Sequence, residues 1–288
     1  MPHLMGHEGC ATVLDIGPGV KNVKEGDLVV LHWREGKGIQ SDVPSYYWRG
    51  SKLNAGWVTT FNSHAVISEN RCTKIPSNTN KNIAALFGCA ITTGFGVIEN
   101  NAKLKMGESV IIFGAGGIGL NMVQAAKLSS ASIIIAVDRF DNRLEIAKRL
   151  GATHTINSSN SDYKEKIESI IKNKDLDVFI DNTGIPEIIE YGYKISSAIG
   201  RIVLVGVPRM GNNINIFSLP LHFGKTIVGS HGGEADPSKD ISRYLKIGEK
   251  QLTNYANLIS DEISIDQINK AIADMRNGLT AGRVIIQL

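Results

Sequence analysis

Residues 114–119, Gly-Ala-Gly-Gly-Ile-Gly, are the part of this sequence that points most directly to chemistry. Their G-x-G-x-x-G pattern follows a predicted strand and opens a predicted helix, which is the context in which it binds the pyrophosphate of a dinucleotide. Gly114 would allow the sharp turn, Gly116 would let backbone N–H groups approach the phosphates, and Gly119 would let helix and strand pack closely. The helix N-terminus would add partial positive charge. A glycine turn without a ligand is the alternative interpretation.

An acidic residue at the end of the next predicted strand completes this candidate site. The Asp138 carboxylate can accept hydrogen bonds from the adenosine ribose hydroxyls, and it would repel a 2′-phosphate. The sequence therefore favours NAD over NADP. Arg139, which follows directly, opposes that preference because a guanidinium attracts phosphate.

A second set of candidates consists of metal-ligand types near the start of the chain and a cysteine far from them. His7 and Glu8 precede a predicted strand, and Cys89 lies in the segment Gly-Cys-Ala-Ile-Thr-Thr-Gly. Imidazole and thiolate are both zinc ligands, so a zinc site is one interpretation. On spacing alone, a hydrogen-bonded structural histidine and a buried apolar cysteine are the more ordinary interpretation.

The glycine pattern lies in a region where short apolar runs alternate with helical patterns. Runs rich in β-branched residues predict six strands, at 110–113, 133–137, 154–156, 178–180, 202–205 and 226–228. The segments between them predict helices, at 120–128, 142–150, 162–172 and after Pro186. Such runs suit a parallel sheet buried on both faces, and the alternation with helices predicts right-handed βαβ units. The fold class is therefore α/β, with a Rossmann-type doubly wound parallel sheet.

The flanking regions have a different, β-rich pattern. Short strands are predicted at 11–16, 28–32 and 64–67, separated by glycine-containing turns. Residues 33–60 lack clear periodicity and predict a long surface excursion, a kind of loop that is often functional. Near the end of the chain, the pattern predicts an amphipathic helix and then a strand, at 265–278 and 284–286.

Composition limits the class of protein. The 288 residues include 31 Lys and Arg against 28 Asp and Glu, and the net charge of +3 does not predict a nucleic-acid-binding or polybasic membrane protein. No apolar run is long enough to span a membrane, and the first residues lack a signal-peptide pattern. Cys10, Cys72 and Cys89 are too widely spaced for a disulfide framework, so we expect a cytoplasmic protein.

Seven segments, taken in order along the chain, together carry a resemblance to a known family. They are residues 6–9, 25–29, 88–96, 114–119, 181–184, 205–208 and 282–284. In this order they resemble the zinc-dependent medium-chain alcohol dehydrogenases over essentially the whole chain. The resemblance implies an NAD-binding Rossmann domain at 90–230 and a GroES-like catalytic domain made of 1–89 and 231–288. It also implies hydride transfer between an alcohol or aldehyde and NAD(H), with catalytic zinc as Lewis acid.

The resemblance implies roles for individual residues. His7 and Cys89 match zinc ligands, and Glu8 matches a residue that lies next to the metal or ligates it transiently. Thr93 matches a catalytic position that flanks the nicotinamide. The residues that match cofactor contacts are Gly114, Gly116, Gly117, Ile118, Gly119, Asp138, Arg143, Thr183, Val205, Gly206, Val207 and Arg283. For residues 205–207, sheet core is the alternative interpretation.

Two departures from the family pattern bear on zinc. Family members carry a further stretch upstream, which holds another cysteine ligand and a proton relay, so we expect an N-terminally incomplete catalytic domain here. His32 and His64 could replace that ligand, although surface or strand-end histidines are the ordinary interpretation. Many members also have four closely spaced cysteines where residues 33–57 of this chain have none, so no structural zinc is expected.

Residues 33–57 are instead aromatic and basic. Their three Trp and two Tyr are expected to pack this segment rather than to wall a substrate pocket. Their basic side chains, Arg34, Lys37, Arg49 and Lys52, are expected to be solvated rather than to bind an anionic substrate.

The remaining expectations concern assembly and activity. Residues 215–221 match an edge that pairs sheets between subunits, so we expect a homo-oligomer, most simply a dimer. His231 is expected to shape the hinge that returns the chain to the catalytic domain, with a nicotinamide contact as the alternative. The expected function is an NAD(H)-dependent, zinc-type alcohol dehydrogenase or aldehyde reductase. The alternatives are a catalytically impaired nucleotide- or partner-binding relative and a zinc-independent reductase.

Overall fold

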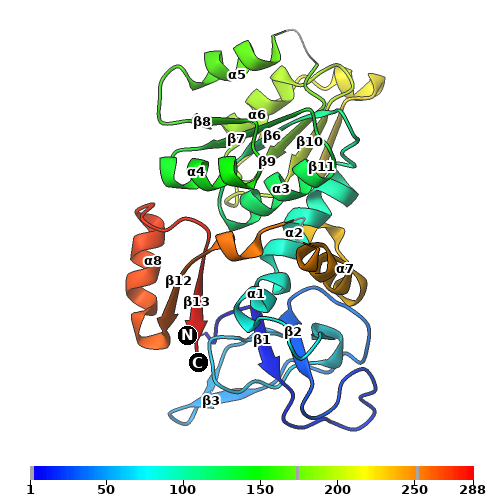
Figure 1. Cartoon of the computed structure of the whole chain (residues 1–288), viewed down its shortest axis with the longest axis vertical. Helices are drawn as coiled ribbons and strands as arrows, with labels where there is room; N and C mark the ends of the chain where they lie inside the picture. The colour runs from blue at the N-terminus through cyan, green and yellow to red at the C-terminus, as the bar shows by residue number, and fades with distance from the viewer. Residues whose placement is uncertain (1–2, 173–174, 251–252) are drawn as a thin grey trace. The chain divides into compact units, whose positions relative to one another are not determined.

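The computed structural model describes residues 3–172, 175–250 and 253–288, and the chain divides into two compact units (Figure 1). Unit 1 is formed by Met1–Thr92 and Ala235–Leu288, of which Met1 and Pro2 lie outside the described residues. Unit 2 is formed by Thr93–Glu234. The domain boundaries expected from the sequence, 89/90 and 230/231, lie within a few residues of these divisions.

Unit 2 is built on a six-stranded parallel sheet, which confirms the expected α/β class. The strand order is β11-β10-β9-β6-β7-β8. The strands are β6 (Ser109–Phe113), β7 (Ile133–Asp138), β8 (His154–Asn157), β9 (Val178–Asp181), β10 (Arg201–Leu204) and β11 (Thr226–Gly229). All six coincide closely with the predicted strands. The four inner strands are largely buried, and buried parallel strands require the continuous apolar runs that the sequence shows, whereas the edge strands β8 and β11 are more exposed.

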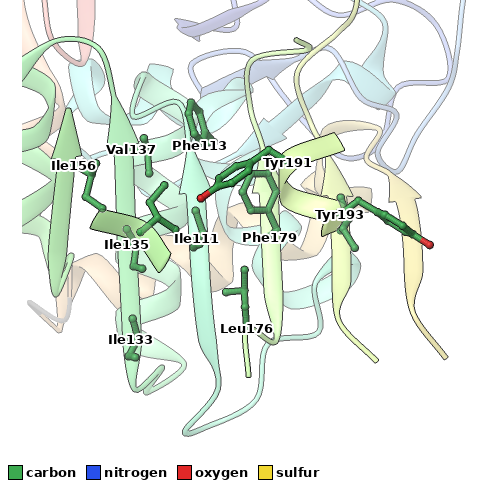
Figure 2. Close-up of a cluster of buried hydrophobic side chains, with 12 residues drawn as sticks. Ile111, Phe113, Ile133, Ile135, Val137, Ile156, Leu176, Phe179, Tyr191 and Tyr193 are labelled. Carbon is green, nitrogen blue, oxygen red and sulfur yellow. The ribbon is translucent and has the colours of Figure 1, made fainter. Parts of the chain in front are cut away.

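Helices cover both faces of this sheet (Figure 1). They are α3 (Gly117–Leu128), α4 (Asp141–Leu150), α5 (Tyr163–Ile171) and α6 (Pro186–Ile195). Helices α5 and α6 pack on the face that presents Ile111, Phe113 and Phe179, and Tyr191 of α6 joins this cluster (Figure 2). The ring centroids of Phe113 and Phe179 are 6.3 Å apart. Burying each such side chain contributes about 1.5–3 kcal/mol, so the cluster is a main source of stability for unit 2.

Unit 1 contains a three-stranded antiparallel sheet in the order β1-β2-β5. These strands are β1 (Glu8–Thr12), β2 (Leu28–His32) and β5 (Cys72–Lys74), with Glu8 paired to His32. A hairpin of β3 (Tyr46–Trp48) and β4 (Ser51–Leu53) and a parallel pair of β12 (Ile259–Ser264) and β13 (Arg283–Gln287) complete its strands. Its helices are α1 (Lys81–Ala85), α7 (Pro237–Glu249) and α8 (Ile268–Arg276), while α2 (Ala90–Gly96) contains the division between the units.

Two predicted strands of unit 1 are wrong. The strand expected at 11–16 begins instead at Glu8 and ends at Thr12, because its partner strand begins opposite Thr12, at Leu28. No strand forms at 64–67, where the backbone N–H of Val66 donates to the Tyr46 hydroxyl at 3.2 Å rather than to a neighbouring strand.

The excursion expected at 33–60 contains the β3–β4 hairpin. Its two central residues, Arg49 and Gly50, have φ values of 50° and 77°, which is the left-handed backbone that two-residue hairpin turns require. The packing role expected for the aromatic side chains is wrong for three of them. Tyr47, Trp48 and Trp57 are 70%, 54% and 47% exposed. Tyr47 and Trp48 lie on the two-stranded ribbon, which cannot bury both of its faces.

Within the described part of the chain, no single helix has the length and apolar character needed to cross a membrane, although one bent pair, Lys81–Gly88 with Ala90–Asn101, meets that test by length and composition.

Candidate functional site

The glycine segment forms a tight turn between β6 and α3. Gly114 has a φ of +100°, and its N–H donates to Val137 O on β7 at 2.8 Å. A Cβ on Gly119 would collide with the Gly114 carbonyl oxygen, so only glycine lets the first turn of α3 pack this closely on the end of β6. Gly116 is the N-cap of α3, and a Cβ built on it would meet nothing within 4 Å. Gly117 and Ile118 then form the first turn of the helix.

This turn lies where the order of the strands reverses. Strand β6 is followed in the sheet by β7 and β8 on one side and by β9, β10 and β11 on the other. In open α/β sheets, ligands bind outside the carboxyl ends of the strands at such a switch point. A side chain from the loop after β9 reaches the glycine turn across this switch point, because Asn182 Nδ2 donates to Gly114 O at 3.1 Å. Asn182 lies in one of the segments that resemble the family, but the sequence analysis predicts no role for it. Its position directly after a buried strand is the sequence feature that could have indicated one.

Asp138 is buried at the end of β7, beside the glycine segment. Its carboxylate accepts from Ala115 N–H at 2.8 Å and from Phe140 N–H at 3.1 Å. Arg143 Nη1, from α4, lies 3.6 Å from Asp138 Oδ2. The carboxylate therefore anchors the turn, and each of its oxygens keeps a lone pair with which it could accept from a ribose hydroxyl.

The loops after β9 and β10 approach each other closely. The carboxylate of Asp181 is buried and accepts from the backbone N–H groups of Thr183 at 3.0 Å and Gly184 at 2.8 Å. Burial raises the pKa of Asp181, although these hydrogen bonds oppose the shift. A Cβ on Gly206 would collide with Gly184 N, so glycine is required there as well. Val205 and Gly206 lie at the strand end, their N–H groups bonded to Asp181 O, and Val207 beyond them is exposed.

The residues of unit 2 at this switch point fit a dinucleotide. The backbone around Gly116 is open to an approaching group, while the first N–H groups of the twelve-residue helix α3 lack acceptors within the helix. Such a helix start attracts a phosphate. The predicted cofactor residues from Gly114 to Gly206 thus lie together at the carboxyl ends of β6, β7, β9 and β10. Arg283 belongs to unit 1, so its expected pyrophosphate contact stays a prediction.

The candidates of unit 1 gather around Glu8. Glu8 Oε2 accepts from Ala90 N–H at 3.0 Å, and Glu8 Oε1 lies 3.6 Å from Arg283 Nη2 on β13. Cys89 is buried immediately before Ala90, whereas the side chain of His7 is exposed. His7 and Glu8 line a groove of about 690 Å³, which is also bordered by Arg283. Thr93, in α2, is buried in unit 2.

The expected zinc ligands do not fit a metal site. Among residues 3–172, 175–250 and 253–288, no three His, Cys, Asp or Glu side chains are grouped so that they could hold a metal ion. The Glu8 carboxylate is instead engaged by a backbone N–H and a guanidinium. His64 is exposed, with Nδ1 3.0 Å from Ser63 Oγ.

His32 is a structural residue at the end of β2. Its Nδ1 lies 2.8 Å from Arg34 O and its Nε2 lies 2.9 Å from Thr73 Oγ1. Because a carbonyl can only accept, Nδ1 carries the proton and Nε2 accepts from the threonine hydroxyl. Burial lowers the pKa of His32 to about 4, so the ring is neutral at pH 7.

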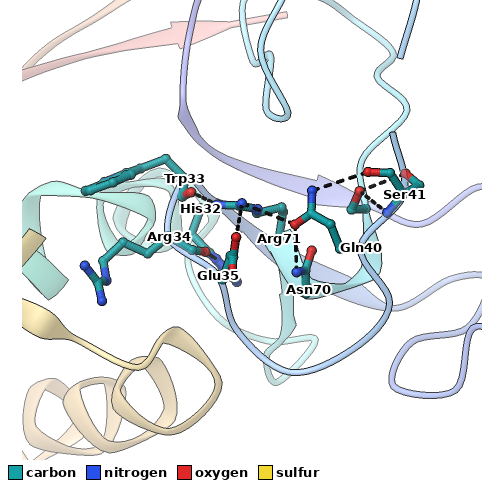
Figure 3. A network of polar contacts seen from close by, with 9 residues as sticks. His32, Trp33, Arg34, Glu35, Gln40, Ser41, Asn70 and Arg71 are labelled. Atoms are coloured by element: carbon teal, nitrogen blue, oxygen red, sulfur yellow. Dashed lines mark hydrogen bonds and ion pairs between the residues drawn. The ribbon is translucent and has the colours of Figure 1, made fainter. Parts of the chain in front are cut away.

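A buried arginine organises the cysteine-free segment that begins at residue 33 (Figure 3). The Arg71 guanidinium donates to Trp33 O, to Glu35 Oε1 at 3.0 Å and to Gln40 Oε1 at 3.2 Å. Arg34, which was expected to be solvated, donates from Nε to Ala235 O at 2.9 Å. Charged side chains thus hold this segment within unit 1.

His231 lies where the chain leaves unit 2. Its N–H donates to Glu234 Oε1 at 2.9 Å, across a turn in which Gly232 and Gly233 have φ values of 67° and 69°. The side chain of His231 is exposed, and the division between the units follows directly after Glu234. The hinge and nicotinamide roles considered for it stay predictions.

Comparison with known families finds two matches that together span both units. Residues 1–77 match the alcohol dehydrogenase GroES-like domain, and residues 117–249 match the zinc-binding dehydrogenase family. Among curated proteins, the S-(hydroxymethyl)glutathione dehydrogenase of Photobacterium damsela subsp. piscicida is 28% identical, over 99% of this chain and 84% of its own length.

Solved structures resemble the whole chain. The benzyl alcohol dehydrogenase of Acinetobacter calcoaceticus is 32% identical with a TM-score of 0.89, over 100% of this chain and 84% of that one. An alcohol dehydrogenase zinc-binding domain protein of Burkholderia ambifaria is 29% identical with a TM-score of 0.91, over the same shares. Both the sequence and the fold of this chain are therefore those of one group of oxidoreductases.

Proposed function

The chain belongs to the zinc-dependent medium-chain alcohol dehydrogenase family, and on that premise we propose that it transfers hydride between an alcohol or aldehyde and NAD(H). The observation that carries the proposal is the arrangement at the switch point of unit 2. There the glycine turn, the start of α3 and the Asp138 carboxylate occupy neighbouring positions at the carboxyl ends of β6 and β7.

Different residues of this site would bind different parts of the dinucleotide. The N–H groups at the start of α3 would bind the pyrophosphate, since the absence of a side chain at Gly116 leaves them accessible. Asp138 would accept from the adenosine ribose and at the same time fix the turn through Ala115 N–H. The absence of a side chain at Gly206 lets the loop after β10 pack closely against Thr183 and Gly184 in the loop after β9. When bound, the nicotinamide supplies the carbon that exchanges hydride with the substrate.

The zinc role that the resemblance assigns to His7, Glu8 and Cys89 does not fit their arrangement. Glu8 joins β1 to β13 through Arg283 and to the start of α2 through Ala90 N–H. We therefore assign Glu8 a positioning role within unit 1. In the direction of alcohol oxidation, the hydride leaves the carbinol carbon for the nicotinamide and the hydroxyl proton is released to solvent.

The test of the proposed function uses the purified chain and a substitution that the fold tolerates. Gly116→Asp has room for its side chain but places a carboxylate where the pyrophosphate would lie. We expect NADH to bind the unaltered chain and the variant to bind it at least about 100-fold more weakly, because like charges repel. Gly229→Asp is the matched control, since a Cβ there also meets nothing within 4 Å.

Turnover is measured on the same samples as NADH formed from NAD with benzyl alcohol and with the glutathione adduct of formaldehyde. These probes correspond to the activities named for two similar proteins. NADH formation that is lost in Gly116→Asp and kept in Gly229→Asp supports hydride transfer. NADH binding without turnover favours the nucleotide-binding alternative, and equal NADH affinity in all three proteins contradicts the site itself.

A further inference from the structure

The β3–β4 hairpin lies at the margin of unit 1 and exposes two large aromatic side chains (Figure 1). Tyr47 and Trp48 are each more than half exposed. Tyr47 pairs with Lys52 across the hairpin, so these two side chains share one face. Tyr46 and Leu53 form the next pair, which takes the opposite face and is half-buried. The hairpin therefore turns one face toward unit 1 and presents Tyr47 and Lys52 to solvent.

Two cations accompany the exposed rings. Arg49 lies in the turn of the hairpin, with its guanidinium carbon 4.4 Å from the centroid of the Trp48 ring. Such stacking uses the face of the guanidinium and leaves its N–H edges for binding an anion. In the part of the chain that the structure describes, neither Arg49 nor Lys52 forms an ion pair with a carboxylate. Residues 43–68 contain no Asp or Glu, so the hairpin carries local positive charge.

An apolar recess lies beside the hairpin. It has a volume of about 320 Å³, and Val43, Pro44 and Leu53 are among the residues that line it. Lys52 lines it as well, so a cation adjoins an apolar surface. A phospholipid combines the matching features, which are an anionic phosphate and apolar chains. Tyr47 and Trp48 extend the match, because rings that have a polar edge are enriched where a membrane meets water.

The make-up of this surface favours a membrane over a nucleic acid as its partner. Nucleic acids are bound mainly through several phosphate contacts, and the hairpin offers only Arg49 and Lys52. An anionic leaflet attracts even a few cations, and exposed rings add favourable burial among the headgroups.

We propose that the β3–β4 hairpin docks the chain on the surface of an anionic phospholipid bilayer. Tyr47 and Trp48 enter the headgroup region, while Arg49 and Lys52 bind lipid phosphates. The chain associates with the membrane from one side and does not span it. The proposal is independent of the proposed function, because the hairpin belongs to unit 1 and the glycine turn belongs to unit 2.

Sedimentation with vesicles tests the charge complementarity. The purified chain is mixed with vesicles of equal parts phosphatidylserine and phosphatidylcholine, and separately with vesicles of phosphatidylcholine alone. We expect at least about tenfold stronger binding to the anionic vesicles, because each cation at such a surface contributes about fivefold. The double variant Arg49→Asn with Lys52→Gln should lose this preference. Asparagine is chosen because it tolerates the left-handed backbone of the turn.

The matched control removes the same charge elsewhere. Lys148→Gln with Arg149→Gln changes two exposed cations in the last turn of α4, and it should keep the preference for anionic vesicles. NADH affinity is measured on every variant and should be unchanged, since the substituted side chains lie outside the glycine turn.

Quenching by lipids with brominated acyl chains tests whether the ring itself enters the bilayer. The tryptophan fluorescence of the unaltered chain should fall when brominated anionic vesicles are added. Trp48→Phe keeps an aromatic ring but removes the fluorophore, so the quenching should be at least about halved while vesicle binding stays within about threefold. Trp33→Phe, at a partly buried position, is the control and should keep the quenching.

Several results would overturn the membrane-docking role. They are equal binding to both kinds of vesicle, absence of binding to the anionic vesicles, and equal losses in the hairpin and α4 double variants. Undiminished quenching in Trp48→Phe would show that another part of the chain enters the bilayer. Absence of vesicle binding, together with a smaller mass of the hairpin double variant on gel filtration, would assign this surface to a second copy of the chain. Normal NADH binding in any of these cases leaves the dinucleotide site standing.

Discussion

At the scale of single residues, the partners that a side chain already has decide how far it is available for chemistry. His32, Glu8 and Asp138 are all residue types that take part in catalysis or ligand binding. In the structure each is held by specific partners: His32 by Arg34 O and Thr73 Oγ1, and Glu8 by Ala90 N–H and Arg283. Residue type and spacing show which side chains could act, and the partners show which of them are already engaged.

His32 predicts a specific dependence of stability on pH. Burial lowers its pKa from 6.5 to about 4 in the folded chain, so between these values the unfolded chain binds a proton that the folded chain does not. The stability contributed by the neutral ring is therefore fully present above pH 6.5 and is lost as the pH falls toward 4. We expect a loss of about 3 kcal/mol in unfolding free energy from this group between pH 7 and pH 4.

Urea unfolding at a series of pH values measures this loss. His32→Gln should be less stable at pH 7 but should show a shallower decline in acid. His64→Gln, which changes an exposed histidine, should decline as the unaltered chain does. Parallel pH profiles for the unaltered chain and His32→Gln would show that the acid sensitivity arises elsewhere.

At the scale of elements, a buried lysine caps the C-terminal end of helix α6. Lys225 Nζ donates to Tyr193 O at 2.7 Å and to Ser196 O at 2.9 Å, which are carbonyls at the end of that helix, and burial lowers the lysine pKa. The residue lies just before β11, so it ties the end of the helix to the edge of the sheet. The terminal carbonyls of a helix need such donors when they are buried.

Replacing this lysine should destabilise unit 2. Lys225→Met keeps the aliphatic stem but removes two charge-assisted hydrogen bonds, and we expect it to lower the unfolding free energy by about 3 kcal/mol. Lys194→Met is the control, because Lys194 lies in the last turn of α6 and its side chain is exposed. Urea denaturation midpoints compare the two, and equal losses would show that Lys225 is not a specific cap.

Elements differed in how far the sequence could predict them. The four inner strands of unit 2 were predictable because they are apolar runs with largely buried side chains, as at Ile133–Asp138. Strand β12 was not predictable, because only Ile263 of its sequence Ile-Ser-Asp-Glu-Ile-Ser is buried. The pairing of β12 with β13 depends on contacts between distant parts of the chain. The glycine turn was predictable from local chemistry. The Glu8–Arg283 contact was not, because it joins residues from opposite ends of the chain.

At the scale of the whole molecule, unit 2 presents an apolar surface beside its edge strand. Phe217 and Phe223 are each 71% exposed, and β11 has no neighbour on its outer side among the described strands. Unpaired edges with apolar neighbours are liable to associate. We propose that a second copy covers this surface, most simply in a twofold dimer.

Light scattering after gel filtration tests this assembly. The unaltered chain should elute with the mass of an oligomer, and Phe223→Glu should shift it to the monomer, because a buried charge would be left unpaired in the interface. Leu279→Glu, at an exposed apolar residue of unit 1, should leave the mass unchanged. A monomeric unaltered chain, or an unchanged mass in Phe223→Glu, would contradict the proposed interface.

The contact between Glu8 and Arg283 sets an order for folding during synthesis. Unit 2 is one continuous stretch, Thr93–Glu234, so all of its strands have left the ribosome while the last part of the chain is still being made. Unit 1 needs both of its segments, since Glu8 of β1 meets Arg283 of β13 and Asn82 of α1 bonds Glu262 and Gln287 of the second segment. Domains fold as units as they emerge, and contacts between distant residues form slowly. Unit 2 is therefore expected to fold first, and unit 1 is completed only after its second segment has been made.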